Sequence, residues 1–325
     1  MCAWHRTLIL LLALSGSSTV LASSLAVCAA KQIDSERLAC FDDLAAAVVN
    51  GSLREDIISV ELADLPAAAE RRVQERDVLD NPFSLTAHQP NYILPITYNS
   101  RFNPTPFESV YPDLEGDDIE AKFQISFKAK VWDINDRWTL WGAYTQESWW
   151  QLYNDASAPF RETNYQPEFF ISYDTDFWLG DFHFSDVNLG LNHQSNGRGE
   201  ALSRSWNRVI ASASVEFGDV VVRPRVWYRI QEDEEDDDNP DTEDYYGYGD
   251  LRLAWSIGGN VLSMLLRNNL DMDDNKGAVQ LDWSFPLNRR FKGYVQYFYG
   301  YGESMIDYDV KTNRIGLGVM MTDWL

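Results

Sequence analysis

The sequence predicts an all-β fold, a twelve-stranded antiparallel transmembrane β-barrel with a short, partly helical N-terminal extension. Three observations predict it: segments of about ten residues that alternate apolar and polar side chains, aromatic residues gathered near segment ends, and an N-terminus typical of export. Aromatic residues make up 14% of the 325 residues, and no long apolar run follows the N-terminus. A transmembrane helix is therefore not expected.

Residues 1–23 have the pattern of a secretory signal peptide. The stretch begins with a charged part that includes Arg6 and continues with an apolar core over residues 8–14. Small residues near Ala22 and Ser23 suit cleavage. We expect the chain to leave the cytoplasm, with a buried N-terminal helix as the alternative.

Residues 24–80 predict a small periplasmic extension to which the sequence assigns no chemistry. Helical spacing occurs in Ser35–Val49 and in Asp64–Val78. Cys28 and Cys40 could form one disulfide in an oxidising periplasm. A lipid anchor on Cys28 is the weaker alternative for that residue.

Residues 81–325 predict the barrel itself. In the segment 279–285 the odd-numbered side chains are apolar and the even-numbered ones polar, as in a strand with one face toward lipid. An even strand number closes the barrel with both ends on the periplasmic side, and twelve strands leave an interior filled by polar side chains. A soluble β-sandwich or lipocalin-like barrel is the alternative fold. The expected strands lie near residues 92–100, 119–132, 137–150, 164–174, 182–195, 205–217, 219–230, 244–256, 260–268, 277–285, 290–301 and 312–322.

The charge balance limits the possible partners. The formal net charge is -23, which argues against binding to nucleic acid, and no nucleotide or zinc signature occurs. The most acidic stretch, residues 232–241, follows a strand that runs outward and is therefore expected in an external loop. Such a run could attract divalent cations, but a solvated loop is the favoured interpretation.

One predicted hairpin carries polar residues on its apolar face. Along residues 187–195 the odd-numbered positions form an apolar face that ends in His193 and Ser195. The returning strand places Asn207 on the same face as the apolar odd positions of 209–217. A hairpin symmetric about residue 200 sets His193 opposite Asn207, with Cβ atoms roughly 4.5–5.5 Å apart.

This trio has the order of a nucleophile, a base and an orienting residue. A Ser two residues from a His that faces an Asn is the arrangement of acyl-transfer enzymes. Polar side chains clustered on a lipid face are costly without a role. Because the strand runs outward, Ser195 would lie at the outer-leaflet boundary, where a phospholipid ester could reach it. A neutral Asn avoids the cost of an ionised Asp on a lipid-facing wall.

Two neighbouring motifs carry a resemblance to a known family. Asn192-His-Gln-Ser-Asn-Gly-Arg198 and Ser203-Arg-Ser-Trp-Asn-Arg208 resemble the active-site signature of outer membrane phospholipase A. The resemblance extends from about Asp80 to the end of the chain. Further matching stretches are Asp80–Phe83, Tyr144–Gln146, Ser148–Gln151, Pro159–Tyr165, Asp238–Asp241 and Gly300–Tyr308.

The resemblance implies a catalytic trio and a metal. Ser195 matches the nucleophile, His193 the general base and Asn207 the residue that orients the His. The implied cofactor is Ca²⁺, which prefers oxygen ligands. Its implied ligands are the Arg198 backbone carbonyl, the Ser203 hydroxyl and Ser157 of the partner subunit.

The resemblance also implies an assembly. Gln146 matches a polar residue at the family's dimer interface, and the implied active form is a homodimer in the bacterial outer membrane that acts on membrane phospholipids. The residues alone leave two other functions open. One is a non-catalytic narrow channel or surface barrel, and the other is an esterase that deacylates lipopolysaccharide.

Overall fold

The computed structural model describes residues 38–39, 66–79, 81, 84–113, 115–155, 157–233, 235, 237–288 and 290–325. A compact unit spans Arg71–Leu325 and contains the barrel. The expected signal peptide, most of the expected helix Ser35–Val49, and both Cys28 and Cys40 lie outside the described residues.

The described part of the chain consists mainly of β-strands that follow one another in sequence. Short helices occur before the barrel and within its loops. The elements are α4 (Ala67–Leu79), β1 (Leu85–Thr86), β2 (Asn91–Asn99), α5 (Thr105–Val110), β3 (Ile119–Asn135), β4 (Trp138–Trp150), β5 (Phe160–Leu179), β6 (Phe182–Ser195), the 3₁₀ turn η1 (Glu200–Leu202), β7 (Ser205–Phe217), β8 (Val220–Ile230), α6 (Thr242–Tyr246), β9 (Gly249–Ile257), β10 (Asn260–Asn268), β11 (Gly277–Pro286), β12 (Lys292–Gly300) and β13 (Thr312–Thr322).

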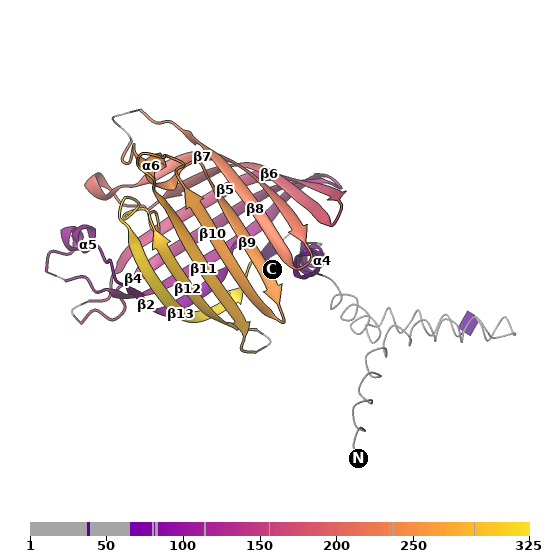
Figure 1. The fold of residues 1–325 in the computed structure, drawn as a ribbon, viewed down its shortest axis with the longest axis horizontal. Helices are drawn as coiled ribbons and strands as arrows, with labels where there is room; N and C mark the ends of the chain where they lie inside the picture. The colour runs from indigo at the N-terminus through magenta and orange to yellow at the C-terminus, as the bar shows by residue number, and fades with distance from the viewer. Residues whose placement is uncertain are drawn as a thin grey trace, which may run out of the picture. The chain divides into compact units, whose positions relative to one another are not determined.

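Strands β2 to β13 form a closed antiparallel barrel, which confirms the predicted fold and strand number (Figure 1). Each strand pairs with its neighbour in sequence, and β13 pairs with β2 to close the ring. The two-residue strand β1 adds to β3. Two predicted strands had wrong bounds. The strand expected near residues 164–174 spans Phe160–Leu179, and residues 242–246 form α6, so the following strand begins only at Gly249. The aromatic run there continues across a helical turn that the alternation did not reveal.

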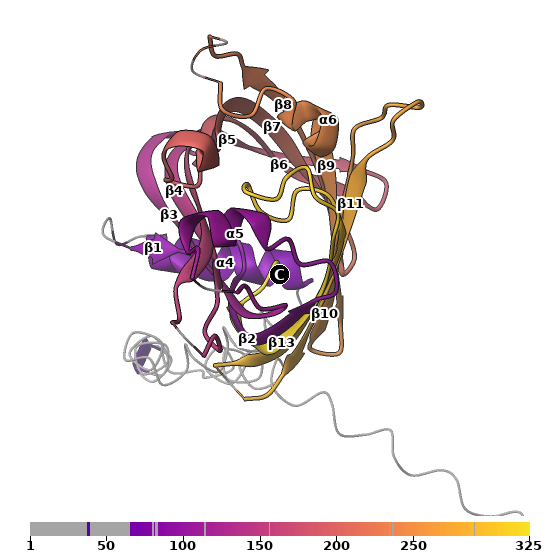
Figure 2. The ribbon, with the colours of Figure 1, turned by 90° about the vertical axis from the view of Figure 1, so that its left-hand side faces the viewer.

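The two ends of the barrel differ in their connections. Short turns join β3 to β4, β5 to β6, β7 to β8 and β9 to β10 at one end. Longer loops, among them residues 196–204, 231–248 and 301–311, lie at the other end. Figure 2 looks into the barrel from the end that carries α5. Short periplasmic turns and longer external loops are typical of outer-membrane barrels.

The two faces of each strand differ in polarity. On β6, Leu189 and Leu191 are 53% and 58% exposed on the outside, whereas Asn192 is only 3% exposed and points inward. The interior holds buried ion pairs such as Arg314 Nη2 with Glu120 Oε2 at 2.8 Å. The expectation of an interior filled by polar side chains is therefore confirmed.

Helix α4 contacts the barrel through charged side chains. Arg72 forms an ion pair with Glu216 of β7. The Glu75 carboxylate accepts hydrogen bonds from Lys128 Nζ and, at 2.9 Å, from the Thr86 hydroxyl. Burial favours the neutral acid, but Lys128 and Thr86 together hold the pKa of Glu75 below its ordinary value. No helix among the described residues is long and apolar enough to span a membrane.

Candidate active site

The hairpin of β6 and β7 has the register that the sequence predicted. His193 pairs with Asn207, and Ser195 pairs with Ser205. Because paired residues and residues two apart share a face, His193, Ser195 and Asn207 all lie on the outer face with Leu191. The three are half-buried near the loop-bearing end of the barrel. Strand pairing alone thus brings the predicted trio together.

A hydrogen bond fixes the imidazole. His193 Nδ1 lies 2.8 Å from Asn207 Oδ1, so Nδ1 carries the proton and Nε2 is left as the basic nitrogen. Ser195 follows two residues along the same face. Among the described residues no hydrogen bond joins its hydroxyl to His193, a contact that commonly tightens only when substrate binds.

Asn196 shapes the loop that follows Ser195. Its side chain is 4% exposed, and its Oδ1 accepts hydrogen bonds from the backbone N–H groups of Arg198 and Arg204 at 3.2 and 3.1 Å. Its Nδ2 donates to the Leu202 carbonyl at 2.9 Å. Gly197 has φ +64°, and a Cβ there would meet the Tyr165 ring at 2.9 Å. One buried amide and one glycine therefore set the path of residues 196–204.

The two implied calcium ligands of this loop have oxygen atoms available. In the part of the chain that the structure describes, no hydrogen bond ends on the Arg198 carbonyl or the Ser203 hydroxyl. Ser157 is exposed on the loop between β4 and β5. Uncharged oxygen donors of this kind fit Ca²⁺, although they are few. The described residues contain no cluster of three His, Cys, Asp or Glu side chains that could hold a metal.

Sequence reasoning missed a buried carboxylate that holds this loop. Glu162 of β5 is fully buried and accepts a hydrogen bond from Arg198 Nε at 3.3 Å. It also accepts from Asn164 Nδ2 at 2.7 Å and from the Ile306 backbone N–H at 3.2 Å. Glu162 therefore ties the loop after β6 to the loop before β13. The only sequence signal was its place in the matching stretch Pro159–Tyr165.

The acidic run 232–241 is not simply solvated, which corrects the favoured interpretation. Asp237 Oδ1 binds Arg229 Nη2 at 2.6 Å, and Asp241 accepts a hydrogen bond from the Tyr308 hydroxyl. Burial and the nearby Asp241 carboxylate raise the pKa of Tyr308 well above its usual range. Glu232 accepts a hydrogen bond from Asn207 Nδ2 at 2.7 Å. The loop is thus anchored at three of its acidic residues.

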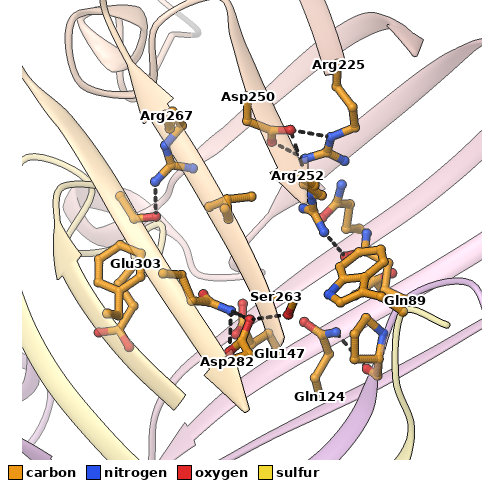
Figure 3. A pocket seen from close by; sticks show the side chains of 18 of the residues that line it. Gln89, Gln124, Glu147, Arg225, Asp250, Arg252, Ser263, Arg267, Asp282 and Glu303 are labelled. Atoms are coloured by element: carbon orange, nitrogen blue, oxygen red, sulfur yellow. Dashed lines mark hydrogen bonds and ion pairs between the residues drawn. The ribbon is translucent and has the colours of Figure 1, made fainter. Parts of the chain in front are cut away.

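A polar cavity of about 130 Å³ lies inside the barrel, apart from the trio. Its walls carry opposite charges, with Asp250 between Arg225 and Arg252 on one side and Asp282 near Glu147 on the other (Figure 3). None of His193, Ser195 and Asn207 lines it, because their side chains point outward. The trio is therefore open to the outer surface of the barrel and not to this cavity.

Gln146, expected at a dimer interface, lies on the outer face of β4. It pairs with Ile125 of β3, which is 50% exposed, and with Tyr165 of β5. Its side chain accepts a hydrogen bond from the Tyr144 hydroxyl at 3.1 Å and donates to the Ser148 hydroxyl at 3.2 Å. The face is thus outward, as an interface requires, and its role in assembly stays a prediction.

Comparison with known proteins gives a consistent set of relatives. Residues 69–321 match the family model Phospholipase A1. The Phospholipase A1 of Proteus vulgaris is 39% identical over 247 residues, 75% of this chain and 83% of that protein. The structure of outer membrane phospholipase A from Escherichia coli is similar with a TM-score of 0.70 and 36% identity, covering 75% of this chain and 100% of that one. A Salmonella typhi outer membrane phospholipase, solved as a dimer with bound calcium, has a TM-score of 0.71 and 35% identity, covering 77% and 96%.

Proposed function

The chain belongs to the phospholipase A1 family, and from this premise we propose that it hydrolyses the acyl ester bonds of membrane phospholipids and lysophospholipids. Ser195 is the proposed nucleophile, His193 the general base and Asn207 the residue that orients it. The observation that carries this proposal is the 2.8 Å contact between His193 Nδ1 and Asn207 Oδ1, on the outer face beside Ser195. The outer membrane is the proposed location, and residues 1–23 the proposed signal peptide.

The proton path follows from the geometry. His193 Nε2 takes the Ser195 proton as the hydroxyl oxygen attacks the ester carbonyl, and then delivers it to the departing lysolipid oxygen. In the second half, His193 takes a proton from water, which attacks the acyl-enzyme, and returns it to the Ser195 oxygen. Proton transfer of this kind contributes about 10²–10⁴-fold to the rate.

The outer face explains both the substrate and the choice of Asn. Leu189 and Leu191 lead along β6 to the trio and would contact acyl chains in the outer leaflet. An ionised side chain against His193 would have to be desolvated there, whereas a neutral amide orients the ring at lower cost. The lipid-facing surface would thus both bind the acyl chains and carry the reacting side chains.

Calcium and a second subunit complete the proposal. The Arg198 carbonyl and the Ser203 hydroxyl would hold Ca²⁺ from one protomer, and Ser157 of the partner subunit would add a third oxygen. When bound, calcium supplies positive charge near the developing oxyanion. Ca²⁺ usually has about six to eight oxygen ligands, and one protomer offers only two protein oxygens here. A dimer that adds the Ser157 oxygen of the partner subunit is therefore the favoured active form.

The test is phospholipid hydrolysis by detergent-refolded full-length protein, with calcium or with a chelator. Ser195→Ala should abolish fatty-acid release. Ser205→Ala is the matched control, because Ser205 lies opposite Ser195 on the same face and should leave most activity. Equal hydrolysis by wild type and Ser195→Ala would refute the nucleophile. Full activity in chelator would refute the cofactor.

A further inference from the structure

We propose that Glu232 is a positioning residue that acts through Asn207, so that the trio is extended by one carboxylate. The inference rests on the proposed function and adds a residue that the trio does not include. It comes from two consecutive hydrogen bonds that run from the imidazole to the loop after β8. His193 Nδ1 lies 2.8 Å from Asn207 Oδ1, and Asn207 Nδ2 lies 2.7 Å from Glu232 Oε1.

Strand pairing places Glu232 at this position. Asn207 of β7 pairs with Ile230, the last residue of β8, and Glu232 follows two residues later. Residues two apart along an extended chain point to the same side, so the carboxylate comes to the outer face that carries Asn207. Glu232 is half-buried there, beside the external loop.

The carboxylate determines which way the Asn207 amide points. An ionised carboxylate only accepts hydrogen bonds, whereas an amide has one accepting and one donating end. The NH₂ end of Asn207 must therefore face Glu232, and its oxygen must face His193. Without Glu232 the amide could turn and present its NH₂ group to the ring, which would reverse the tautomer that Ser195 needs.

The carboxylate also strengthens the amide as an acceptor. A hydrogen bond to a charged partner is roughly twice as strong as a neutral one, and linked hydrogen bonds polarise one another. Negative charge at Glu232 thus makes Asn207 Oδ1 more negative and stabilises the imidazolium that forms during the attack. The Asn207 amide separates this charge from the ring, so the group in direct contact with the imidazole is neutral.

Glu232 differs from its neighbours in the acidic run. Asp237 is bound to Arg229 and Asp241 to Tyr308, so both anchor the loop. Asp233 is exposed, and among the described residues its side chain has no hydrogen bond or ion pair. Asp233→Asn therefore removes the same charge from the same loop without touching the chain of hydrogen bonds, and it serves as the matched control.

The experiment measures kcat, KM, the calcium concentration for half-maximal activity and the melting temperature of the refolded full-length protein. Glu232→Gln should lower kcat about 5-fold and Glu232→Ala about 10-fold or more, since a charged hydrogen bond is replaced by a neutral one or lost. KM, the calcium requirement and the melting temperature should stay close to wild type. Asp233→Asn should match wild type in every measurement.

A double-mutant cycle tests whether Glu232 acts through Asn207. In an Asn207→Ala background, Glu232→Gln should cause no further loss of kcat, because the link to His193 is already missing. The same fold loss in both backgrounds, or normal kcat in Glu232→Ala, would overturn this inference alone. A wild type without Ser195-dependent hydrolysis would instead overturn the proposed function and this inference with it.

Discussion

Replacing Glu162 with Gln removes the negative charge that holds Arg198 while preserving the shape of the side chain. Glu162 is fully buried, and its Oε2 accepts from Arg198 Nε at 3.3 Å. In the variant, Gln can still accept from Ile306 N–H and Asn164, but its NH₂ group faces a guanidinium that only donates. The lost interaction is a charge-assisted hydrogen bond beneath the loop that carries the proposed calcium ligands.

The expected cost follows from the burial of the two partners. A hydrogen bond to a charged group contributes about 1.5–3 kcal/mol, but the Arg198 side chain keeps 22% exposure, so water replaces part of the contact. We expect Glu162→Gln to lower the free energy of unfolding by about 1–2 kcal/mol. Glu162→Ala also orphans the buried Ile306 N–H and should cost about 3–5 kcal/mol.

The assay combines guanidinium unfolding followed by Trp fluorescence with a calcium titration of phospholipid hydrolysis. Because the Arg198 carbonyl must be ordered again when calcium binds, Glu162→Gln should raise the calcium concentration for half-maximal activity about 3- to 10-fold. Asp113→Asn, at an exposed loop residue, is the control and should change neither quantity. A destabilised variant with an unchanged calcium requirement would refute the link between Glu162 and the metal site.

Three further outcomes are expected. Ser157→Ala and Ser195→Ala should each be inactive as the single variant, but a mixture of the two should regain part of the activity. In a mixed dimer, one of the two sites combines an intact Ser195 from one protomer with an intact Ser157 from the other. No recovery of activity in the mixture would argue against a site shared between protomers. Gly318→Ala should prevent closure between β13 and β2, since a Cβ there would lie 2.0 Å from a backbone oxygen of β2. The control Gly142→Ala should fold, and folding is measured by the heat-modifiable shift of the barrel on a gel. An unchanged gel shift of Gly318→Ala would contradict this expectation. Because the pKa of Glu75 is lowered from 4.5, its carboxylate stabilises the fold above about pH 4.5 and the contribution is lost as pH falls through the lowered pKa. Glu75→Gln should thus melt a few degrees below wild type at pH 7, with the difference shrinking below pH 4, and a difference that persists in acid would contradict the ion pair.

The trio could be predicted from the sequence because every step of that argument is local. Alternation placed His193 and Ser195 on one face of β6, and a hairpin symmetric about residue 200 set the register that pairs His193 with Asn207 of β7. The predicted strand start near residue 244 was wrong because alternation over a few residues does not distinguish a strand from one helical turn. Tyr245 and Tyr246 continue an apolar and polar pattern that a single helical turn also satisfies.

Glu162 and Glu232 could not be found by such local reasoning. Glu232 contacts Asn207 because β8 ends at Ile230, opposite Asn207, and this strand end determines where the next residues of the loop lie. Glu162 of β5 contacts Arg198 and Ile306, which lie in two loops far from it in the sequence. Among many carboxylates in an acidic chain, no pattern distinguishes those that accept a hydrogen bond from an active-site side chain.

The sequence by itself determined the barrel, its strand number, the outward face of the hairpin and the order of the trio, because periodicity and short turns are encoded by neighbouring residues. Only the tertiary structure decided which acidic residues hold the site. The folded barrel gathers β5, the loop after β8 and the loop before β13 around one hairpin end. Those contacts depend on where each strand ends and on how the loops fold over the barrel end, which act between segments and leave no period in the chain.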